Sequence, residues 1–325
     1  MDISLQRLYV TGARARTIAW LGVMAVAGSA TWLAVVGFAY LRQWDQVGAE
    51  IAMARGQMVG PALVVAVVAI FAAEQRWPAV RRPLLARAHV VDAVYFALFA
   101  LAVVPLLTLV QTGVWVEVQR HAAFLVLGQL PLALRAVAIA VALVAMDAAN
   151  WAAHVANHRY ASFWRLHALH HSQEDMSVFT TFRTHPLIHA TYLPAAIPAV
   201  VLGANGGLPA AAMIVYGCLV ALPHANLRWS LGPLGKVIVS PAYHRIHHVR
   251  ELGPDGAVNF GFVLVVWDRL ARRAELPVAG PPVLTGLARR PVPVEQGVGR
   301  PALPRVVLAQ LAQPFLVNPT AGGSR

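Results

Sequence analysis

The sequence predicts an all-α integral membrane protein with about four transmembrane helices and a cytoplasmic helical cap. Of its 325 residues 58% are hydrophobic and 12% are charged, whereas a soluble domain typically carries about a quarter charged residues. Long apolar stretches are bounded by charged side chains, and the mean hydropathy is +0.60. Eight of the 13 histidines fall into three short groups, which indicates a chemically active region next to the apolar spans.

Four apolar segments each have close to the ~20 residues that cross about 30 Å of hydrocarbon. The first contains an uncharged run of 25 residues, 17–41, which fits a spanning helix better than the shorter core of a cleavable signal peptide. The spans are bounded by Arg16 and Arg42, by Arg55 and Glu74, by Asp92 and Glu117, and, for the fourth, by Arg135 and the stretch from Asp147 to His154.

Arginine placement predicts which side of the membrane each loop occupies. The N-terminal segment holds three arginines and the second loop holds four, against two in each of the other two loops. This excess favours a cytoplasmic N-terminus, and four crossings then place everything after His154 in the cytoplasm. The predominance of arginine, with Lys236 as the only lysine, is typical of a GC-rich bacterium, so we expect the inner membrane.

The net charge of +12 is consistent with residues that flank a membrane on its cytoplasmic side. Nucleic-acid binding is not expected, because the chain has no dense arginine tract with interleaved aromatic residues. Cys218 is the only cysteine, so an internal disulfide and a cysteine-based zinc site are both excluded, and we expect it to be an ordinary buried residue.

A second uncharged stretch, residues 190–223, is interrupted by a turn-forming run at 203–207. Its arms are short for full crossings, so a re-entrant hairpin fits as well as two spans. From about Pro277 proline and glycine are frequent, and we expect a surface tail with one short amphipathic piece near Val306–Leu311. The chain is thus divided into residues 1–88 with the first two helices, 89–275 with helices three and four, the hairpin and a metal site, and 276–325 as the tail.

The three histidine groups have the spacing of metal ligands on helices. Positions i, i+3 and i+4 share one helix face, so each group presents its imidazoles together. Neutral imidazole is the commonest protein metal ligand, and a nitrogen-only set suits iron, zinc or copper. Eight ligands exceed what one ion takes, which predicts two metals. The groups are His154-Val-Ala-Asn-His158, His167-Ala-Leu-His170-His171 and His244-Arg-Ile-His247-His248.

The other histidines differ in what their positions predict. His224 lies at the cytoplasmic end of the hairpin, where an ionisable group is functional by default, and we expect it to be a ninth ligand. His185 and His189 flank Pro186 and could support the ligands, face a substrate, or be structural. His89 and His121 lie near helix ends, where solvated side chains are the usual case.

These motifs, taken with the residues between them, resemble the fatty acid hydroxylase and sterol desaturase superfamily of integral membrane di-iron enzymes. The resemblance covers about residues 90–271, and the first two spans and the tail lie outside it. It rests on Asp147, Trp151-x-x-His154-x-x-x-His158-Arg159, Phe163-Trp-Arg-Leu-His167-x-x-His170-His171-Ser172, Arg183-x-His185-Pro186, His224-x-Asn226, Ser240-Pro-x-x-His244-Arg-x-His247-His248, Asn259-Phe-Gly261 and Trp267-Asp-Arg-Leu270.

Two departures from the family pattern leave the subfamily and the substrate open. Ile188 stands where the family often has glutamate, and Leu270-Ala-Arg stands where it tends to have an aromatic residue followed by Gly-Thr. Neither departure removes a ligand. The resemblance implies two iron ions that bind O2, take external electrons and hydroxylate or desaturate a C–H bond of a lipid, such as a fatty acyl chain, sterol, carotenoid or alkyl glycerol. Zinc could replace iron in purified protein.

The remaining expectations concern the partners and the surroundings of the metals. No nicotinamide, flavin or haem motif is evident, so a separate ferredoxin, cytochrome or reductase is expected to supply electrons to a basic cytoplasmic face. Acidic side chains are expected to fix the imidazole tautomers through the second ring nitrogen, whereas Asp175 is expected to be an ordinary surface carboxylate. The residues of the basic face are Arg159, Arg165, Arg183, Arg245 and Arg250, several of which could equally be lipid-headgroup or structural contacts. Those expected to support the ligands are Asp147, His185, Asn226, Asn259 and Asp268, although the two aspartates could instead be ordinary helix-end or surface carboxylates.

Two other functions compete with lipid oxidation. A membrane transporter or metal sensor could also use a histidine site, but the first three spans lack the polar path that transport needs. A non-catalytic scaffold is disfavoured because every principal histidine is present, although isoleucine at position 188 leaves it open. The sequence makes no prediction of the oligomeric state.

Overall fold

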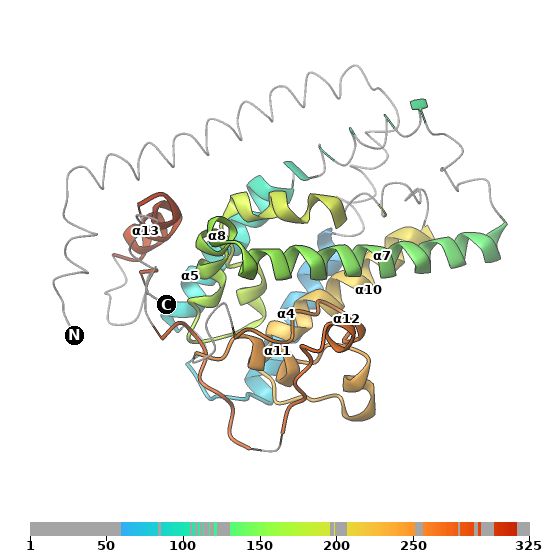
Figure 1. Cartoon of the computed structure of the whole chain (residues 1–325). Helices are drawn as coiled ribbons and strands as arrows, with labels where there is room; N and C mark the ends of the chain where they lie inside the picture. The colour runs from blue at the N-terminus through green and yellow to red at the C-terminus, as the bar shows by residue number, and fades with distance from the viewer. Residues whose placement is uncertain are drawn as a thin grey trace.

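The described part of the protein is helical and contains no β-strand beyond isolated bridges, which confirms the predicted helical class there. In this computed structural model it comprises residues 60–83, 86–104, 131–195, 207–250, 256–278, 280–288, 292–293 and 302–316, with residue 198 and scattered positions between 105 and 121. The first predicted span lies outside these residues. The helices are α4 (Gly60–Arg76), α5 (Arg87–Leu98), α7 (Leu132–Arg159), α8 (Ala161–His171), α10 (Gly207–Ala221), α11 (Pro241–His247), α12 (Val266–Leu270) and α13 (Leu303–Leu316) (Figure 1).

Short helical turns connect these elements. They are the π-turn η2 (Phe99–Val103) and the 3₁₀ turns η5 (Val178–Phe182), η6 (Pro186–Tyr192), η7 (Leu222–His224) and η8 (Gly232–Lys236). The compact middle of the chain packs beneath the C-terminal half of α7, and α11 and α12 lie on the opposite side of the molecule from α13 (Figure 1).

The long helix α7 has the length and composition of a membrane span. Its segment Ala133–Arg159 has 27 residues and a mean hydropathy of 1.7, yet only 22% of its most apolar stretch is buried. Leaving apolar surface in water costs roughly 25 cal/mol per Å², so this exposure suits lipid. At 1.5 Å per residue α7 is about 40 Å long, and its last two turns, with His154 and His158, extend beyond about 30 Å of hydrocarbon.

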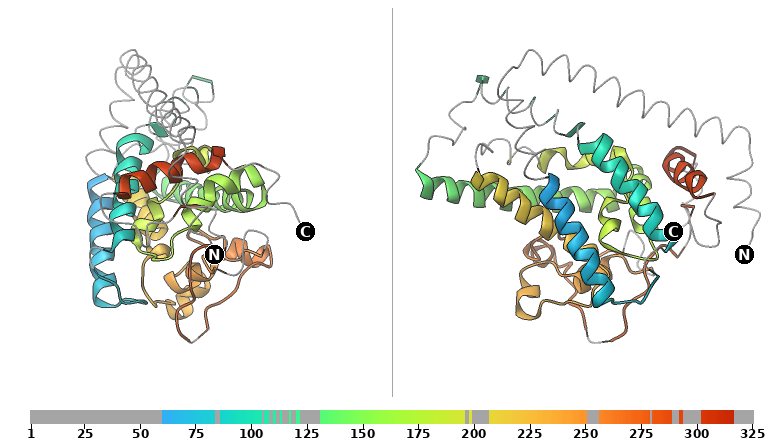
Figure 2. Two further views of the ribbon diagram at one scale, coloured as in Figure 1. Left: turned by 90° about the vertical axis from the view of Figure 1, so that its left-hand side faces the viewer. Right: turned by 180° about the vertical axis from the view of Figure 1, so that it is seen from behind.

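Two shorter apolar helices, α4 and α10, pack on one another, and α10 also packs on α7. The helix α4 occupies much of the second predicted span and packs on α10, where Gly217 leaves room for Leu63. Seen from behind, α4 and α5 run side by side (Figure 2). Among the described residues only α7 is long and apolar enough to count as a span, so the four crossings and their orientation stay predictions.

Two residues expected near solvent are buried instead. Asp92 was expected to mark the start of the third span, but it lies inside α5 with a side chain 0% exposed. His89 was expected to be solvated, but it is buried in the same helix, with its ring 5.4 Å from that of Phe71. Both turn inward because α5 packs against the middle of the domain, where Arg183 and Gln173 bond Asp92 and the ring of Phe71 contacts His89.

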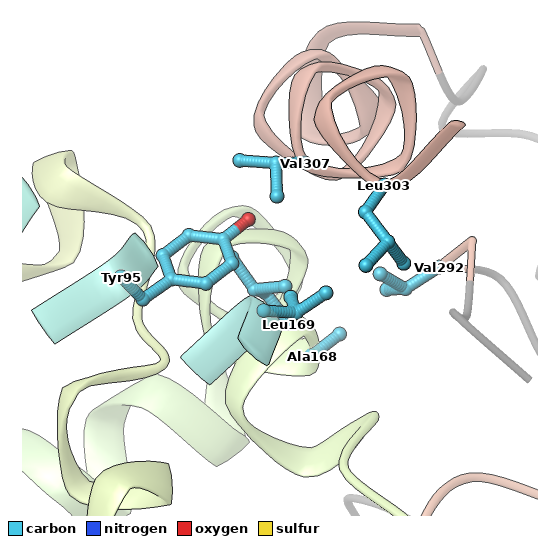
Figure 3. Packing of buried hydrophobic residues seen from close by; sticks show 7 residues of the cluster. Tyr95, Ala168, Leu169, Val292, Leu303 and Val307 are labelled. Atoms are coloured by element: carbon cyan, nitrogen blue, oxygen red, sulfur yellow. The ribbon is translucent and has the colours of Figure 1, made fainter. Parts of the chain in front are cut away.

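The tail contributes to the hydrophobic core. Its helix α13 is longer than the amphipathic piece expected at Val306–Leu311, and its inner face packs on α5 and α8 (Figure 3). The Tyr95 hydroxyl also donates a 3.0 Å hydrogen bond to the buried side chain of Gln310. The cluster comprises Val91, Tyr95, Ala168, Leu169, Val292, Leu303 and Val307.

Candidate metal centre

The structure brings all nine histidines singled out in the sequence into one buried region. They come from the end of α7, from α8, from η7 and from α11 with its C-cap, and none is more than 9% exposed. Their donor atoms form two groups in which every atom lies within 4.8 Å of the others in its group. The first group is His154, His158, His167, His171 and His247, and the second is His170, His224, His244 and His248.

Helix boundaries explain how distant segments meet at this centre. The helix α7 ends and α8 begins at a single extended residue, Tyr160, with φ −105° and ψ 123°, so that α8 turns back against the end of α7. At the start of α11 the Ser240 hydroxyl accepts a hydrogen bond from Tyr243 N at 3.1 Å, and Pro241 occupies the first turn. These caps fix where each histidine face begins.

Within the centre, ring nitrogens point at one another. The Nε2 atoms of His154 and His167 are 3.1 Å apart, as are those of His247 and His171. A carbonyl can only accept, so the Nδ1 atoms of His154 and His247 must donate to Phe260 O at 2.8 Å and Val258 O at 2.7 Å. Their neutral rings therefore direct unprotonated Nε2 lone pairs into the first group.

In the second group His224 stands between two other rings. Its Nε2 lies 3.0 Å from the Nε2 atoms of both His170 and His244. A neutral imidazole nitrogen carries either one N–H group or one lone pair. The Nε2 atom of His224 therefore cannot make an ordinary hydrogen bond to both neighbours at once. Nitrogens that converge in this way are arranged as ligands around a common ion would be.

Several buried ring nitrogens have no hydrogen-bond partner among the residues that the structure describes. Both nitrogens of His158 and His248 are in this state, as are the Nδ1 atoms of His170 and His244. An unpaired buried polar atom costs about 1–3 kcal/mol, and the converging Nε2 lone pairs would be satisfied by a cation. The donor set is entirely imidazole, which fits a transition metal.

Burial keeps the histidines of the centre in the neutral form that binds a metal. Burial lowers the pKa of His170 to about 3, and the neighbouring His154 adds to the shift. The rings are therefore neutral near pH 7, as metal ligands must be. For the same reason, burial first and neighbouring histidines second, the pKa is well below its usual value for His167, His171, His244 and His248.

The carboxylates do not have the role expected from the sequence. Asp147 and Asp268 were expected to bond the imidazoles, but both bind the segment that follows Asn259. Asp147 accepts from the backbone N–H groups of Val263 and Leu264 at 3.0 and 3.1 Å. A carboxylate can hold several N–H groups of a loop at once, which leaves the loop's own carbonyls to bond the imidazoles.

Asp268 binds the first residues of the same segment. Its two oxygens accept from Phe260 N, Gly261 N, the Tyr243 hydroxyl and Trp151 Nε1, each at 2.9 Å. Because Phe260 O bonds His154, the carboxylate positions this ligand through the backbone. Desolvation raises the pKa of Asp268, and its four donors oppose that rise.

The backbone geometry explains why asparagine and glycine occupy the ends of the motif Asn259-Phe-Gly261. Asn259 has a positive φ of 60°, and its side chain donates to the carbonyls of Tyr243 and Glu275 at 2.9 and 2.8 Å. A Cβ at Gly261 would lie 2.8 Å from Leu264 O and 2.9 Å from a Val239 methyl group, so only glycine fits. The Asn259 side chain was expected to orient a ligand or a water, but it bonds the backbone of Tyr243 and Glu275.

Asn226 and His185 also bond other groups. Asn226 accepts from Arg245 at 3.1 Å and exchanges two hydrogen bonds with the backbone of Val80, so it holds the residue next to His244. His185 accepts from Leu187 N at 3.2 Å and donates to Leu311 O at 3.1 Å. Both of its ring nitrogens are used in joining η6 to α13, which is the structural role that the sequence had left open.

Two arginines assigned to a basic surface are buried. Arg183 is 0% exposed and lies 3.0 Å from Asp92, and Arg245 is 5% exposed. Neither can attract a soluble partner, because inward-facing helices and loops enclose both. Asp175, by contrast, is partly exposed and pairs with Arg82, as an ordinary surface carboxylate would.

Sequence reasoning missed two buried carboxylates that flank the centre. Asp92 accepts from Gln173 at 2.8 Å and pairs with Arg183 beneath α8. Glu74 is 1% exposed and accepts from Val178 N and Asn226 N at 2.6 and 3.0 Å. Each was interpreted as the charged boundary of a span. The one feature of the sequence that could have indicated their burial is that each is an isolated charge at the end of an apolar run.

Comparison with known proteins confirms the resemblance. Residues 139–272 match the family model described as Fatty acid hydroxylase. The chain is 34% identical to an ornithine lipid hydroxylase of Rhizobium tropici over 184 residues, 54% of this chain and 50% of that protein. It is 28% identical to an alkylglycerol monooxygenase of Caenorhabditis elegans over 154 residues, 41% of this chain and 26% of that protein. The chain thus spans half or less of these relatives, and no solved structure matches it significantly.

We expect bound metal to be retained when the pH falls from about 7.5 to about 5.5, below the value near 6.5 where an exposed histidine takes up a proton. With the pKa of His170 near 3, protons compete with a metal at this ring only in strong acid. Between the ordinary histidine pKa near 6.5 and the pKa of His170 near 3, the unfolded chain binds a proton that the folded chain excludes. Lowering the pH through this window therefore also reduces the stability of the metal-free fold. The metal-to-protein ratio after gel filtration measures retention, and release centred near pH 6.5 would contradict the expectation.

Asp268→Asn is expected to lower both thermal stability and metal content. Asparagine offers one acceptor oxygen where the carboxylate offers two, and each buried donor left unpaired costs about 1–3 kcal/mol. The unfolding midpoint and the metal-to-protein ratio measure the two effects. Asp175→Asn is the matched control, because that side chain is partly exposed. Equal behaviour of the two variants would show that Asp268 does not organise the centre.

Proposed function

We propose that this member of the fatty acid hydroxylase family is a membrane-bound di-iron oxygenase that inserts oxygen into a C–H bond of a lipid. The observation that carries the proposal is the pair of buried all-imidazole groups at the end of an apolar helix. The relatives are named as a lipid hydroxylase and a monooxygenase, which favours hydroxylation over desaturation. In the balanced reaction one atom of O2 enters the C–H bond, and the other leaves as water with two external electrons and two protons.

The two histidine groups would each hold one ion. Iron bound there would supply the activation of O2 that a C–H bond requires. Because the ligands are neutral, the bound ions would keep their full positive charge, unlike those in carboxylate-rich sites of soluble helix bundles. The carbonyls of Val258 and Phe260 keep two ligand rings in the tautomer with a free Nε2. Zinc also suits this donor set, so metal analysis of the purified protein decides the identity and number of ions.

A small cavity beside the centre suits the lipid. It has a volume of about 140 Å³ and lies between α7 and η6. The ring of Tyr192, in its wall, is 5.6 Å from that of Phe262, and the ring of Phe262 is 5.4 Å from that of His154. We assign an apolar segment of the substrate to this cavity, with Phe262 between it and the first histidine group. The cavity is lined by Leu107, Met146, Asn150, His189, Tyr192, Leu193 and Ala195.

The orientation and the electron supply complete the proposal. The histidine groups lie beyond the end of α7, which we place on the cytoplasmic side of a bacterial inner membrane. A separate ferredoxin, cytochrome or reductase would then deliver electrons from the cytoplasm. Of the arginines expected to attract it, Arg159 is exposed and Arg165 and Arg250 are partly exposed, so these three are the candidates for contact.

Replacing one ligand of each group tests the proposal. His247→Ala and His170→Ala are each expected to lose bound iron and to abolish lipid oxidation, because each removes a donor from one converging set. Iron is measured by elemental analysis, and oxidised lipid by mass spectrometry of the expressing cells. His121→Ala is the control, since its side chain is 76% exposed. Full oxidation by metal-free protein would overturn the proposal, and metal flux into proteoliposomes would support a transporter.

A larger side chain in the cavity tests the assignment of the substrate. Leu193→Trp is expected to reduce oxidation of long lipids or to shift the oxidised position, with iron content unchanged, because the indole fills space that the lipid needs. Leu187→Trp is the control, at a site on the same turn that is 47% exposed. An unaltered product pattern in the Leu193→Trp protein would show that the lipid lies elsewhere.

A further inference from the structure

An exposed apolar surface lies on two segments that do not span the membrane. One segment surrounds η8 and the other is α12. Together they present five large apolar side chains to solvent, between 39% and 73% exposed. We call this surface the apolar ledge, and it comprises Trp229, Leu234, Val237, Val266 and Leu270.

Hydrogen bonds join the two segments of the ledge and fix them to α7. Val265 N donates to Val237 O at 2.9 Å, which ties α12 to the end of η8. Asp147 of α7 accepts from Leu264 N at 3.1 Å and from Trp267 Nε1 at 2.9 Å. The ledge is therefore held at the level of Asp147 along α7.

This level has a definite depth if α7 crosses the bilayer, as the proposed function requires. Asp147 lies fourteen residues after Ala133, the first residue of the candidate span, and at 1.5 Å per residue this is about 21 Å. The hydrocarbon is about 30 Å thick. The ledge then lies within about 10 Å of the boundary that faces the histidine groups, where acyl chains meet headgroups.

The side chains around the ledge are those that interfaces favour. Trp77, 53% exposed, has its ring 6.2 Å from that of Trp229, and the Arg76 guanidinium lies 5.4 Å from the centre of the Trp77 ring. Arg228 and Lys236 are exposed within or beside the same segment. Tryptophan concentrates at headgroup level, and basic side chains there attract anionic lipids.

We propose that the apolar ledge inserts into the leaflet next to the histidine groups and binds its anionic lipids. The occupant of this surface is thus the bilayer itself. The ledge would hold the domain against the membrane on the side of α12, so that contact with lipid does not depend on spanning helices alone.

Single cysteines can test this directly, because Cys218 is the only cysteine to remove. In a Cys218→Ser background, Leu234→Cys and Leu270→Cys each carry an environment-sensitive fluorophore, and Leu284→Cys is the control. Leu284 is 65% exposed, and its backbone carbonyl accepts a hydrogen bond from Arg250 N, two residues after the last histidine motif. The proteins are reconstituted into vesicles of phosphatidylethanolamine and phosphatidylglycerol, with and without brominated acyl chains.

The expected result is emission at shorter wavelength and quenching by brominated chains at positions 234 and 270, with quenching by aqueous iodide at 284. Equal access of iodide to all three positions would overturn the proposal. Protection from iodide without quenching by brominated lipid would also overturn it, since another protein or a second copy would then cover the ledge. Iron content and lipid oxidation are measured on the same samples. A protein that oxidises lipid but does not insert the ledge contradicts this proposal alone, whereas loss of iron and of oxidation contradicts the proposed function.

Discussion

Buried imidazoles can present lone pairs to one another only when their protons are held elsewhere. Here the carbonyls of Val258 and Phe260 hold the protons of His247 and His154. Those carbonyls are in place because Asp268 binds the N–H groups of the same loop and Asp147 binds those that follow. The geometry of the candidate centre thus depends on the loop from Val258 to Leu264, whose N–H groups two carboxylates hold.

The sequence predicted the members of the centre better than the contacts around them. All nine histidines meet, because their spacing on helices and their order along the chain constrain where they can lie. The roles of Asp147 and Asp268 were predicted wrongly, since no local pattern shows whether a carboxylate faces an imidazole or a backbone N–H group. Asp92 and His89 were likewise misplaced. A polar side chain beside an apolar run is expected both at a membrane boundary and in a buried interaction, and the sequence does not distinguish the two.

The tail shows the same limit at a larger scale. The sequence predicted a surface tail with one short amphipathic piece, yet α13 is a longer helix whose inner face covers Tyr95 and Leu169. Its contacts with α5 and α8 come from residues more than 100 positions earlier in the chain, and neither helical periodicity nor composition reports such contacts. His185 illustrates the result, since a residue of a family motif bonds the tail and not the metal centre.

The division of the histidine motifs between the two groups has a consequence for assembly. His170 belongs to one group, while His167 and His171, on the same helix, belong to the other. The motif of α11 is divided in the same way, so an ion in either group would orient both helices and prepare the second group. Loading should therefore be cooperative, with little singly occupied protein at intermediate metal concentrations.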